Sequence, residues 1–377
     1  MSAWSGKFVI GLTGNIATGK SVVRKMLEHL GAYGIDADAL AHRAIAKGAP
    51  GYQPVVEEFG KWILASDGQV NRTRLGRIVF AEPEALVRLE AIVHPLVGQA
   101  VDLLVRRSIQ KVIVIEAIKL LESGLGSVCD TIWVSYVPEE IQLARLTQKR
   151  KLSKAAARQR VRAQPPQGKK IAAADLVIRN EGTFEDTWQQ VVEGWLSLFP
   201  EAETIPVQRE AAVRGELLVE RAGPQQADEI AAYLTEHSDG GKRYDRADVM
   251  AFFGEKAFLL LRADEELVGL VGWQIENLVA RAANVTLDPA LPLEESMRVM
   301  MQEIESASRE LQCEALLLFL SPEMVEQESV WRNLEYQRRS IESLSVRAWQ
   351  EAAKESMPPG TVMLFKQLRE DRVLRPI

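Results

Sequence analysis

The segment Gly11–Val23, GLTGNIATGKSVV, has residue types suited to binding a phosphate group. Its spacing Gly14-x-x-x-x-Gly19-Lys20-Ser21 fits the pattern G-x-x-x-x-G-K-[ST], in which glycines let backbone N–H groups turn inward around a phosphate. The lysine of this pattern reaches the β- and γ-phosphates of a nucleotide, and the hydroxyl holds Mg²⁺. The alternative is a glycine-rich turn that carries a lysine by chance.

The chain on either side of the loop supports phosphate binding. The apolar run Phe8–Ile10 predicts a strand before the loop, and Lys20–Leu30 predicts a helix after it, whose positive dipole end would face the phosphate. We therefore expect ATP as the phosphate donor and Mg²⁺ at Ser21. The expected nucleotide contacts in the loop are Gly14, Asn15, Ile16, Ala17, Thr18, Gly19, Lys20, Ser21 and Val22.

Two aspartates follow in the stretch Gly34–Gly51, GIDADALAHRAIAKGAPG. Asp36 and Asp38 are expected at the carboxyl end of a second strand, beside the phosphate loop, where ligands of α/β sheets bind. A kinase that acts on an alcohol needs a carboxylate there to accept the hydroxyl proton and to orient the oxygen. Either aspartate could instead cap the helix that starts at Ala37, because Asp is a favoured N-cap residue.

Composition narrows the class of protein. The chain has 377 residues, enough for two domains, and its 46 basic and 52 acidic residues give a net charge of −6. This balance argues against general nucleic-acid binding, which needs a basic excess. The two cysteines, Cys129 and Cys313, lie far apart and suggest neither a zinc site nor a disulfide framework. We expect a cytoplasmic protein with no nucleic-acid or membrane partner, and the sequence does not give its oligomeric state.

The first 200 residues are predicted to form an α/β domain, because short apolar runs alternate with helical patterns. Continuous Val/Ile runs separated by helices are typical of a parallel sheet covered on both faces. The strands are predicted at Lys7–Thr13, Lys111–Glu116, Thr131–Val137 and Asp175–Arg179.

Residues 201–216 are charged, punctuated by proline and aperiodic, which predicts a linker. A second, α+β domain with a mainly antiparallel sheet is predicted over residues 217–377. Its expected helices are Pro224–Glu236 and Glu294–Leu311, with a further helix after residue 320. Its expected strands are Leu217–Arg221, Ala257–Arg262, Leu267–Ile275, Val279–Leu287, Ala315–Leu320, and late strands near Ile341 and Val362.

From about residue 7 to 195 the chain resembles the dephospho-CoA kinase family through motifs that occur in the family's order. The resemblance implies a P-loop kinase with a helical lid, which phosphorylates the 3′-hydroxyl of dephospho-CoA from ATP in the last step of CoA synthesis. The motifs are the loop Gly14–Ser21, IDAD with Asp36 and Asp38, GAPGYQPVVEEFG from Gly48, DGQVNRTRLGRIVF from Asp67, HPLV from His94, Glu122, QLARL with Arg145, RVRAQ with Arg160 and Gln164, and AADLVIRNEG from Ala173.

The resemblance also implies roles for single residues. Asp38 would be the general base with Asp36 supporting it, and Lys20 would place its charge at the phosphates. Arg145 would begin a lid, formed by the basic stretch RLTQKRKLSKAAARQRVR, that brings positive charge to the transferring group. The alternative for this stretch is a solvated helical face.

Three places depart from the family's pattern. An arginine of the family's lid aligns with Lys149, next to Arg150, so either could contact phosphate. The loop reads Asn15 and Ala17-Thr18 where relatives more often have glycine and serine. The segment IKLLE, residues 118–122, lacks the family's proline and contains Lys119, which affects the acceptor pocket.

The second domain is similar to the acyltransferase fold of the GNAT family of N-acetyltransferases. In that family, backbone amides of a glycine-containing loop before a helix bind the pyrophosphate of acyl-CoA. The equivalent stretch here, Leu287–Gln302, has no glycine and carries Glu294 and Glu295, which would repel a pyrophosphate. We therefore expect a degenerate GNAT-like domain that is non-catalytic or regulatory.

Two other functions remain open from the sequence. One is a P-loop kinase for another nucleoside or nucleotide, which would share the loop and lid but not the acceptor pocket. The other is a sensor of CoA or acyl-CoA with a vestigial kinase half. The intact Lys20, Ser21 and Asp38 argue against the sensor, and the ordered motifs favour the kinase of dephospho-CoA.

Overall fold

The computed structural model describes residues 3–148, 151–201, 217–238 and 241–370. Contacts divide the chain into two compact units, which change over between Leu198 and Phe199. Except for Glu201, the linker expected at residues 201–216 lies outside the described residues, as do Lys149 and Arg150. Among the helices described, none is long and apolar enough to cross a bilayer.

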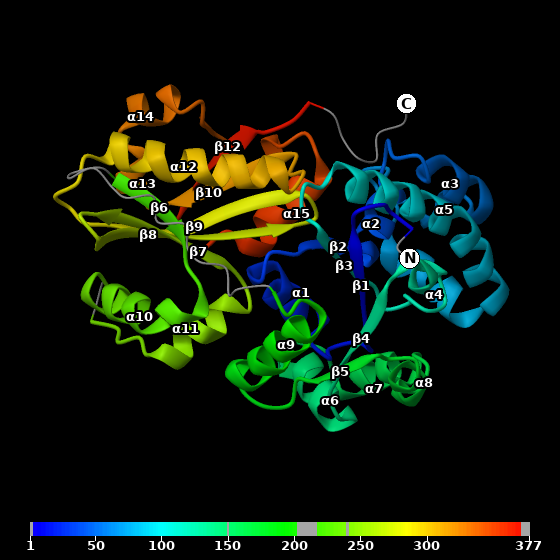
Figure 1. Ribbon diagram of the computed structural model, residues 1–377. Helices are drawn as coiled ribbons and strands as arrows, with labels where there is room; N and C mark the ends of the chain where they lie inside the picture. The colour runs from blue at the N-terminus through cyan, green and yellow to red at the C-terminus, as the bar shows by residue number, and fades with distance from the viewer. Residues whose placement is uncertain (1–2, 149–150, 202–216, 239–240, 371–377) are drawn as a thin grey trace. The chain divides into compact units, whose positions relative to one another are not determined.

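The first unit is built on a parallel sheet of five described strands in the order β2-β3-β1-β4-β5 (Figure 1). Its central strand carries Val9, Ile10 and Leu12, which are fully buried, because helices cover both faces of a parallel sheet. The predicted parallel sheet is confirmed. The strands are β1 (Phe8–Thr13), β2 (Tyr33–Asp36), β3 (Val112–Glu116), β4 (Thr131–Tyr136) and β5 (Leu176–Arg179).

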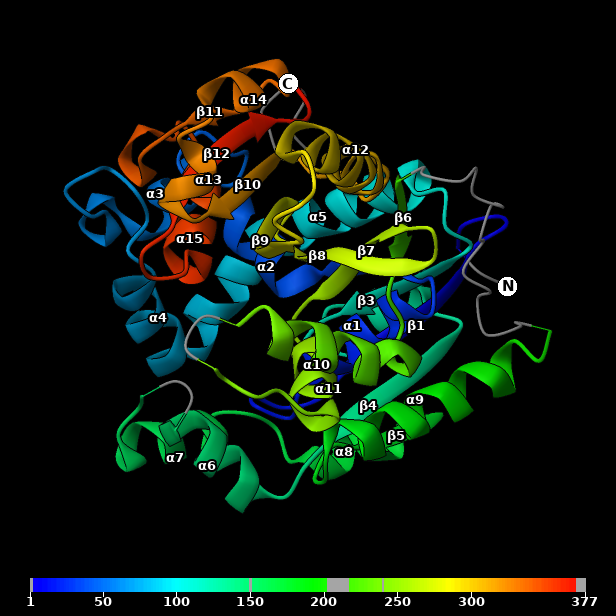
Figure 2. The same ribbon diagram turned by 90° about the vertical axis from the view of Figure 1, so that its left-hand side faces the viewer.

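Helices of the first unit pack on this sheet and on one another. Contacts join α1 to α9 and α2 to α5, and both views show these pairs side by side (Figures 1 and 2). Because the strands are parallel, the residues that follow them meet at one edge of the sheet. The helices are α1 (Lys20–His29), α2 (Ala37–Ala44), α3 (Tyr52–Phe59), α4 (Arg72–Ala81), α5 (Pro83–Arg107), α6 (Glu139–Gln148), α7 (Lys154–Arg162), α8 (Gln167–Ala172) and α9 (Phe184–Leu198), with short 3₁₀ turns at Lys61–Ile63 and Leu125–Val128.

The second unit has a seven-stranded sheet over its described residues, in the order β11-β12-β10-β9-β8-β7-β6. Its pairs are antiparallel except β9 with β10, which are parallel and joined by α12 (Leu293–Glu310). The mainly antiparallel α+β architecture is therefore confirmed. The strands are β6 (Leu217–Arg221), β7 (Ala257–Ala263), β8 (Glu266–Glu276), β9 (Val279–Leu287), β10 (Ala315–Leu320), β11 (Gln337–Arg338) and β12 (Val362–Gln367).

Strand β10, ALLLFL, is buried along its whole length because helices cover both of its faces. Leu316 and Leu318 belong to the same apolar cluster as Met300 of α12. Leu317, on the opposite face, belongs to a second cluster with Trp349 of α15 (Arg347–Ser356). The remaining helices are α10 (Ala227–Glu236), α11 (Arg246–Phe253), α13 (Pro322–Val325) and α14 (Glu328–Asn333), with short 3₁₀ turns at Pro224–Gln226 and Ile341–Ser343.

Three elements of the second unit differ from the sequence predictions. The strand expected near Ile341 is wrong, because Ile341–Ser343 forms a 3₁₀ turn in a polar stretch and the pairing with β12 is made by Gln337–Arg338 instead. The helices α11 and α15 were not predicted. The signal for α11 is a capping box, in which Asp245 and Asp248 each accept a hydrogen bond from the other's backbone N–H. The signal for α15 is the helical spacing of its buried apolar residues.

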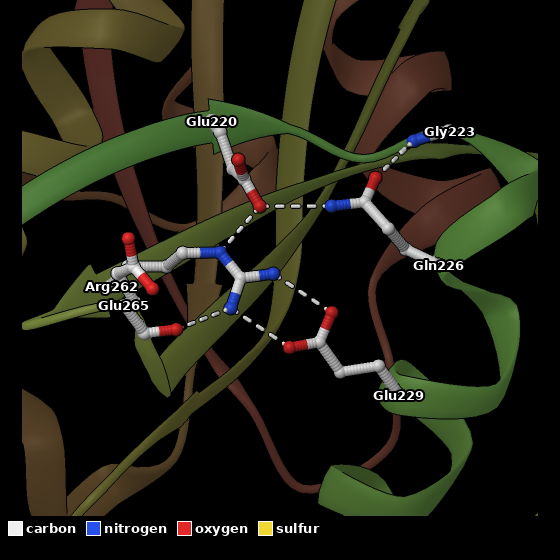
Figure 3. A network of polar contacts seen from close by, with 6 residues as sticks. All are labelled: Glu220, Gly223, Gln226, Glu229, Arg262 and Glu265. Atoms are coloured by element: carbon white, nitrogen blue, oxygen red, sulfur yellow. Dashed lines mark hydrogen bonds and ion pairs between the residues drawn. The ribbon is translucent and has the colours of Figure 1, made fainter. Parts of the chain in front are cut away.

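A polar network ties the edge of the second sheet to α10 (Figure 3). The Arg262 guanidinium on β7 donates to the carboxylates of Glu220 on β6 and Glu229 on α10, and to the Glu265 carbonyl. Gln226 extends the network, since its amide donates to Glu220 at 2.8 Å and its oxygen accepts from the Gly223 N–H at 2.8 Å. Only 11% of the Arg262 side chain and 9% of the Glu220 side chain are exposed.

We expect Arg262→Met to destabilise the second unit by on the order of 3 kcal/mol, because it removes a guanidinium that is hydrogen-bonded to the largely buried carboxylate of Glu220. The matched control is Arg246→Met, whose ion pair with Asp228 is exposed (41% and 73%), so that its loss costs about 1 kcal/mol or less. Urea denaturation of the full chain measures both values. Equal effects of the two substitutions would contradict a structural role for the network.

Candidate active site

The phosphate loop joins β1 to α1 and has the backbone conformation that its glycines permit. Gly19, the residue before α1, has φ = +94°, and a Cβ atom there would lie 1.9 Å from Nδ2 of Asn180. Gly14 has φ = +151°, and its Cβ would lie 2.4 Å from the Ser135 carbonyl oxygen. Ala17 has φ = +61°, a left-handed conformation that costs backbone strain in alanine. The loop therefore keeps its geometry although this residue is not the glycine that relatives more often have.

The carbonyl oxygen of Thr18 is one point where the loop is fixed to the rest of the unit. Three described side chains donate to it: Ser135 of β4 at 2.9 Å, Asn180 after β5 at 3.0 Å, and Arg145 of α6 at 3.3 Å. In a trans peptide the C=O and the next N–H point in opposite directions. The Gly19 N–H is therefore directed away from these donors, as phosphate binding by the loop requires.

Lys20 and Ser21 open α1, as the motif predicts. The Lys20 side chain is buried, and its Nζ donates to the Asn15 carbonyl at 3.4 Å. The Ser21 hydroxyl donates to Oε1 of Glu116 at 2.9 Å, and the other oxygen of Glu116 pairs with Arg24 at 2.8 Å. Sheet register places Glu116, the last residue of β3, opposite Asp36 at the end of β2.

Asp36 caps helix α2, which was the alternative reading of one aspartate. Its Oδ1 accepts from the Ala39 N–H at 2.8 Å. Burial raises the pKa of Asp36 to about 7, the Glu116 carboxylate adds to the rise, and Arg24 and the Ala39 N–H oppose it. Asp36 is thus a carboxyl group that can hold a proton near neutral pH.

Asp38 lies in the first turn of α2 and contacts the segment after β3. Its Oδ2 accepts from the Ile118 N–H at 3.0 Å. Burial raises the pKa of Asp38, while the Ile118 N–H and the charge of Lys20 oppose the rise. The structure therefore brings Asp38 and Lys20, predicted from separate motifs, into one electrostatic environment.

The segment between α7 and α8 lies against the loop. The Ile16 N–H donates to Oε1 of Gln164 at 2.7 Å, and Nδ2 of Asn15 donates to the Pro165 carbonyl at 3.0 Å. Arg145, predicted to begin the lid, contacts the carbonyls of Ala17 and Thr18, and that of Asn180 at 2.7 Å. The predicted lid contacts at positions 149 and 150 lie outside the described residues.

Several residues of the site were missed by sequence reasoning. Glu116 is the last residue of an apolar strand and Asn180 follows one directly. A polar residue at the carboxyl end of a parallel strand is a signal that could have identified both. Ser135 lies inside a strand and gave no such signal. Neither did Lys170 of α8, whose Nζ donates to the Ile118 carbonyl, 52 residues earlier in the chain.

Oxygen donors suited to Mg²⁺ lie at the start of α1. Mg²⁺ in kinases is held by one or two side-chain oxygens together with phosphate oxygens and water. The Ser21 hydroxyl and the Glu116 carboxylate, 2.9 Å apart, supply such oxygens. Among the described residues no group of three His, Cys, Asp or Glu side chains could hold a metal by itself, so the nucleotide would have to complete the ligand set.

Comparison with known proteins decides the family. A family model for dephospho-CoA kinase matches residues 8–186. The dephospho-CoA kinase of Geobacter metallireducens is 46% identical over 190 residues, which cover 50% of this chain and 94% of that relative. The chain belongs to the dephospho-CoA kinase family. The enzyme of the same name from Geobacter sulfurreducens is 43% identical over 195 residues, 51% of this chain and 99% of that relative.

These kinase relatives match about half of the chain. A solved GNAT-family acetyltransferase from Staphylococcus aureus covers 41% of this chain and 100% of its own length, at 11% identity and a TM-score of 0.33. This similarity is too low to assign an activity to residues 217–370.

We expect Asp36→Asn to make the protein more stable above pH 7 and to change its stability least at pH 4. The folded state holds the Asp36 proton up to a pKa of about 7, whereas the unfolded chain loses it near pH 4, so that ionisation destabilises the fold as the pH rises between these values. Asparagine caps a helix as well as aspartate does. The gain above pH 7 should be on the order of 4 kcal/mol, since the pKa rises from 3.8 to about 7 and one pKa unit corresponds to about 1.4 kcal/mol.

Thermal unfolding of both proteins in EDTA, from pH 4 to pH 8, measures this dependence. The comparison at pH 4, where the unfolded chain has only begun to lose the proton, is the internal control. A stability difference that does not change with pH would contradict the raised pKa.

Proposed function

We propose that residues 8–186 transfer the γ-phosphoryl group of ATP to the 3′-hydroxyl of dephospho-CoA, with Asp38 as the general base. The observation that carries this assignment is the position of Asp38, which is half-buried, held by the Ile118 N–H, and close enough to Lys20 for the two charges to interact. A base beside the charge that binds the γ-phosphate is what a hydroxyl acceptor requires.

In the proposed reaction, the oxygen of the ribose 3′-hydroxyl forms a bond to the γ-phosphorus, and Asp38 accepts the proton that this hydroxyl loses. The bond between that phosphorus and the β,γ-bridging oxygen breaks, and ADP leaves. The raised pKa of Asp38 makes it a better proton acceptor than an exposed aspartate. Mg²⁺, held by Ser21 and Glu116, would neutralise phosphate charge.

Asp36 and Arg145 receive positioning roles in this proposal. Asp36 starts α2 through its bond to the Ala39 N–H, and the helix carries Asp38 two residues later. Arg145 donates to the carbonyls of Ala17 and Thr18, and so supports the loop that cradles the phosphates. Contact of Lys149 or Arg150 with phosphate stays a prediction.

For residues 217–370 we propose a non-catalytic or regulatory role. The first turn of α12 carries Glu294 and Glu295, and the Glu294 carboxylate accepts from Asn333 at 2.9 Å. Carboxylates at this helix start disfavour the pyrophosphate of an acyl-CoA. A cytoplasmic location and the absence of a nucleic-acid partner remain proposals that rest on composition.

The test of the kinase proposal is an assay of the full chain with ATP, Mg²⁺ and a panel of nucleoside and nucleotide acceptors, with products identified by mass. We expect CoA from dephospho-CoA and little phosphorylation of the other acceptors. Preference for another acceptor would identify the other kind of P-loop kinase. No product from any acceptor would favour the sensor with a vestigial kinase half.

We expect Asp38→Asn to lower kcat by about 10²- to 10⁴-fold with little change in ATP affinity, because the amide keeps the size but cannot accept a proton. Lys20→Ala is the contrasting variant and should weaken ATP binding as well as kcat, since it removes the charge at the phosphates. If Asp36→Asn proved inactive while Asp38→Asn remained active, the base would be misassigned.

We expect the full chain to transfer no acetyl group from acetyl-CoA to amines. Free thiol released from acetyl-CoA in the presence of an amine panel, with ATP left out, measures this activity. A GNAT-family acetyltransferase assayed in parallel controls the detection. Amine-dependent thiol release would show that the glutamates at the start of α12 do not silence the unit.

A further inference from the structure

Lys170 is a buried cation of the site, in addition to Lys20. It lies on α8, and its side chain leaves only 2% of the residue's surface exposed. Its Nζ donates to the carbonyls of Ile118 and, at 3.5 Å, of Gly14. An ammonium has three N–H donors, and the third meets no acceptor among the described residues.

The two carbonyls place this ammonium between the phosphate loop and the base. Gly14 is the first residue of the loop motif, and the N–H of Ile118 holds the Asp38 carboxylate at 3.0 Å. Lys170 thus contacts both the segment that receives the nucleotide phosphates and the segment that fixes the general base. The phosphoryl group passes between these two segments in the proposed reaction.

Lys170 and Lys20 are two buried cations that form no salt bridge with the described residues. Within the described ranges neither forms an ion pair, and the Lys20 ammonium is likewise satisfied only by a carbonyl, that of Asn15. Burial is the main cause that lowers the pKa of Lys170; Lys20 lowers it further, while Glu122 and Asp38 raise it. Buried charges are normally paired, so two neighbouring ammoniums indicate that an anion completes the site.

We infer that Lys170 is a second cation for the transferring phosphoryl group, which donates its third N–H to an oxygen of that group while Lys20 binds from the loop side. The inference rests on the proposed function, in which the phosphorus exchanges its bond to the ADP oxygen for one to the acceptor oxygen. A donor aimed at the γ-phosphate distinguishes ATP from ADP, because ADP lacks that group.

The experiment compares Lys170→Met with Lys169→Met in the full chain. Lys169 is the preceding residue of the same helix and is exposed, so the control removes the same charge without touching the site. Calorimetry with ATP and with ADP, both with Mg²⁺ and without acceptor, gives the ratio of the two affinities. Steady-state kinetics with dephospho-CoA gives kcat and both KM values.

We expect Lys170→Met to reduce the preference for ATP over ADP by about tenfold or more and to leave ADP affinity within about twofold of wild type. Its kcat should fall by about 10²-fold. Lys170→Arg, which keeps the charge, should recover most of both losses and shows that the helix folds without lysine. Lys169→Met should match wild type in both measurements.

Equal loss of ATP and ADP affinity in Lys170→Met, or an unchanged ratio with a raised KM for dephospho-CoA, would overturn the inference. The first result means a purely structural role, and the second means a contact with the acceptor. An inactive wild type that still shows a Lys170-dependent preference for ATP would refute the proposed function and leave this inference standing. If wild type makes CoA and Lys170→Met matches it in the ATP-to-ADP affinity ratio and in kcat, the proposed function stands and this inference is refuted.

Discussion

The site depends on the fixed orientation of one peptide group, that between Thr18 and Gly19. Its carbonyl accepts hydrogen bonds from Ser135, Arg145 and Asn180, which come from three different elements of the first unit. Binding an anion with backbone N–H groups requires that those groups be oriented before the anion arrives, because reorienting them would consume binding free energy. The three hydrogen bonds to the Thr18 carbonyl oxygen provide that orientation.

The two aspartates of α2 show how environment separates identical side chains. Burial raises the pKa of both groups, to about 7 for Asp36. At Asp36 the Glu116 carboxylate adds to this rise, whereas at Asp38 the Ile118 N–H and the Lys20 ammonium are the stronger neighbours and oppose it. The surroundings therefore favour the protonated form of Asp36 more than that of Asp38.

The sequence predicted the parts of the site that are local in the chain. The loop pattern and the Asp36-Ala37-Asp38 triplet occupy short stretches with fixed spacing, so their positions followed from the strands before them. Contacts made across the fold were not predictable in this way. Lys170 reaches the Ile118 carbonyl from 52 residues away, and nothing in the sequence around it marks that contact.

The same limit applies to the folds of the two units. Long apolar runs such as β3 and β10 were predicted close to their observed bounds, because burial on both faces leaves a continuous apolar signal. The strand expected near Ile341 was wrong, since one apolar residue in a polar stretch does not distinguish a strand from a 3₁₀ turn. The GNAT-like fold of the second unit remains a resemblance in the sequence, supported by its strand order alone.

The donors to the Thr18 carbonyl have a consequence for synthesis of the chain on the ribosome. The loop leaves the ribosome 162 residues before Asn180, which follows the last strand of the sheet. Contacts this distant in sequence form late, because a long loop must close before they contribute. A nascent chain that exposes the glycine-rich loop therefore has no oriented phosphate cradle until nearly the whole first unit has emerged.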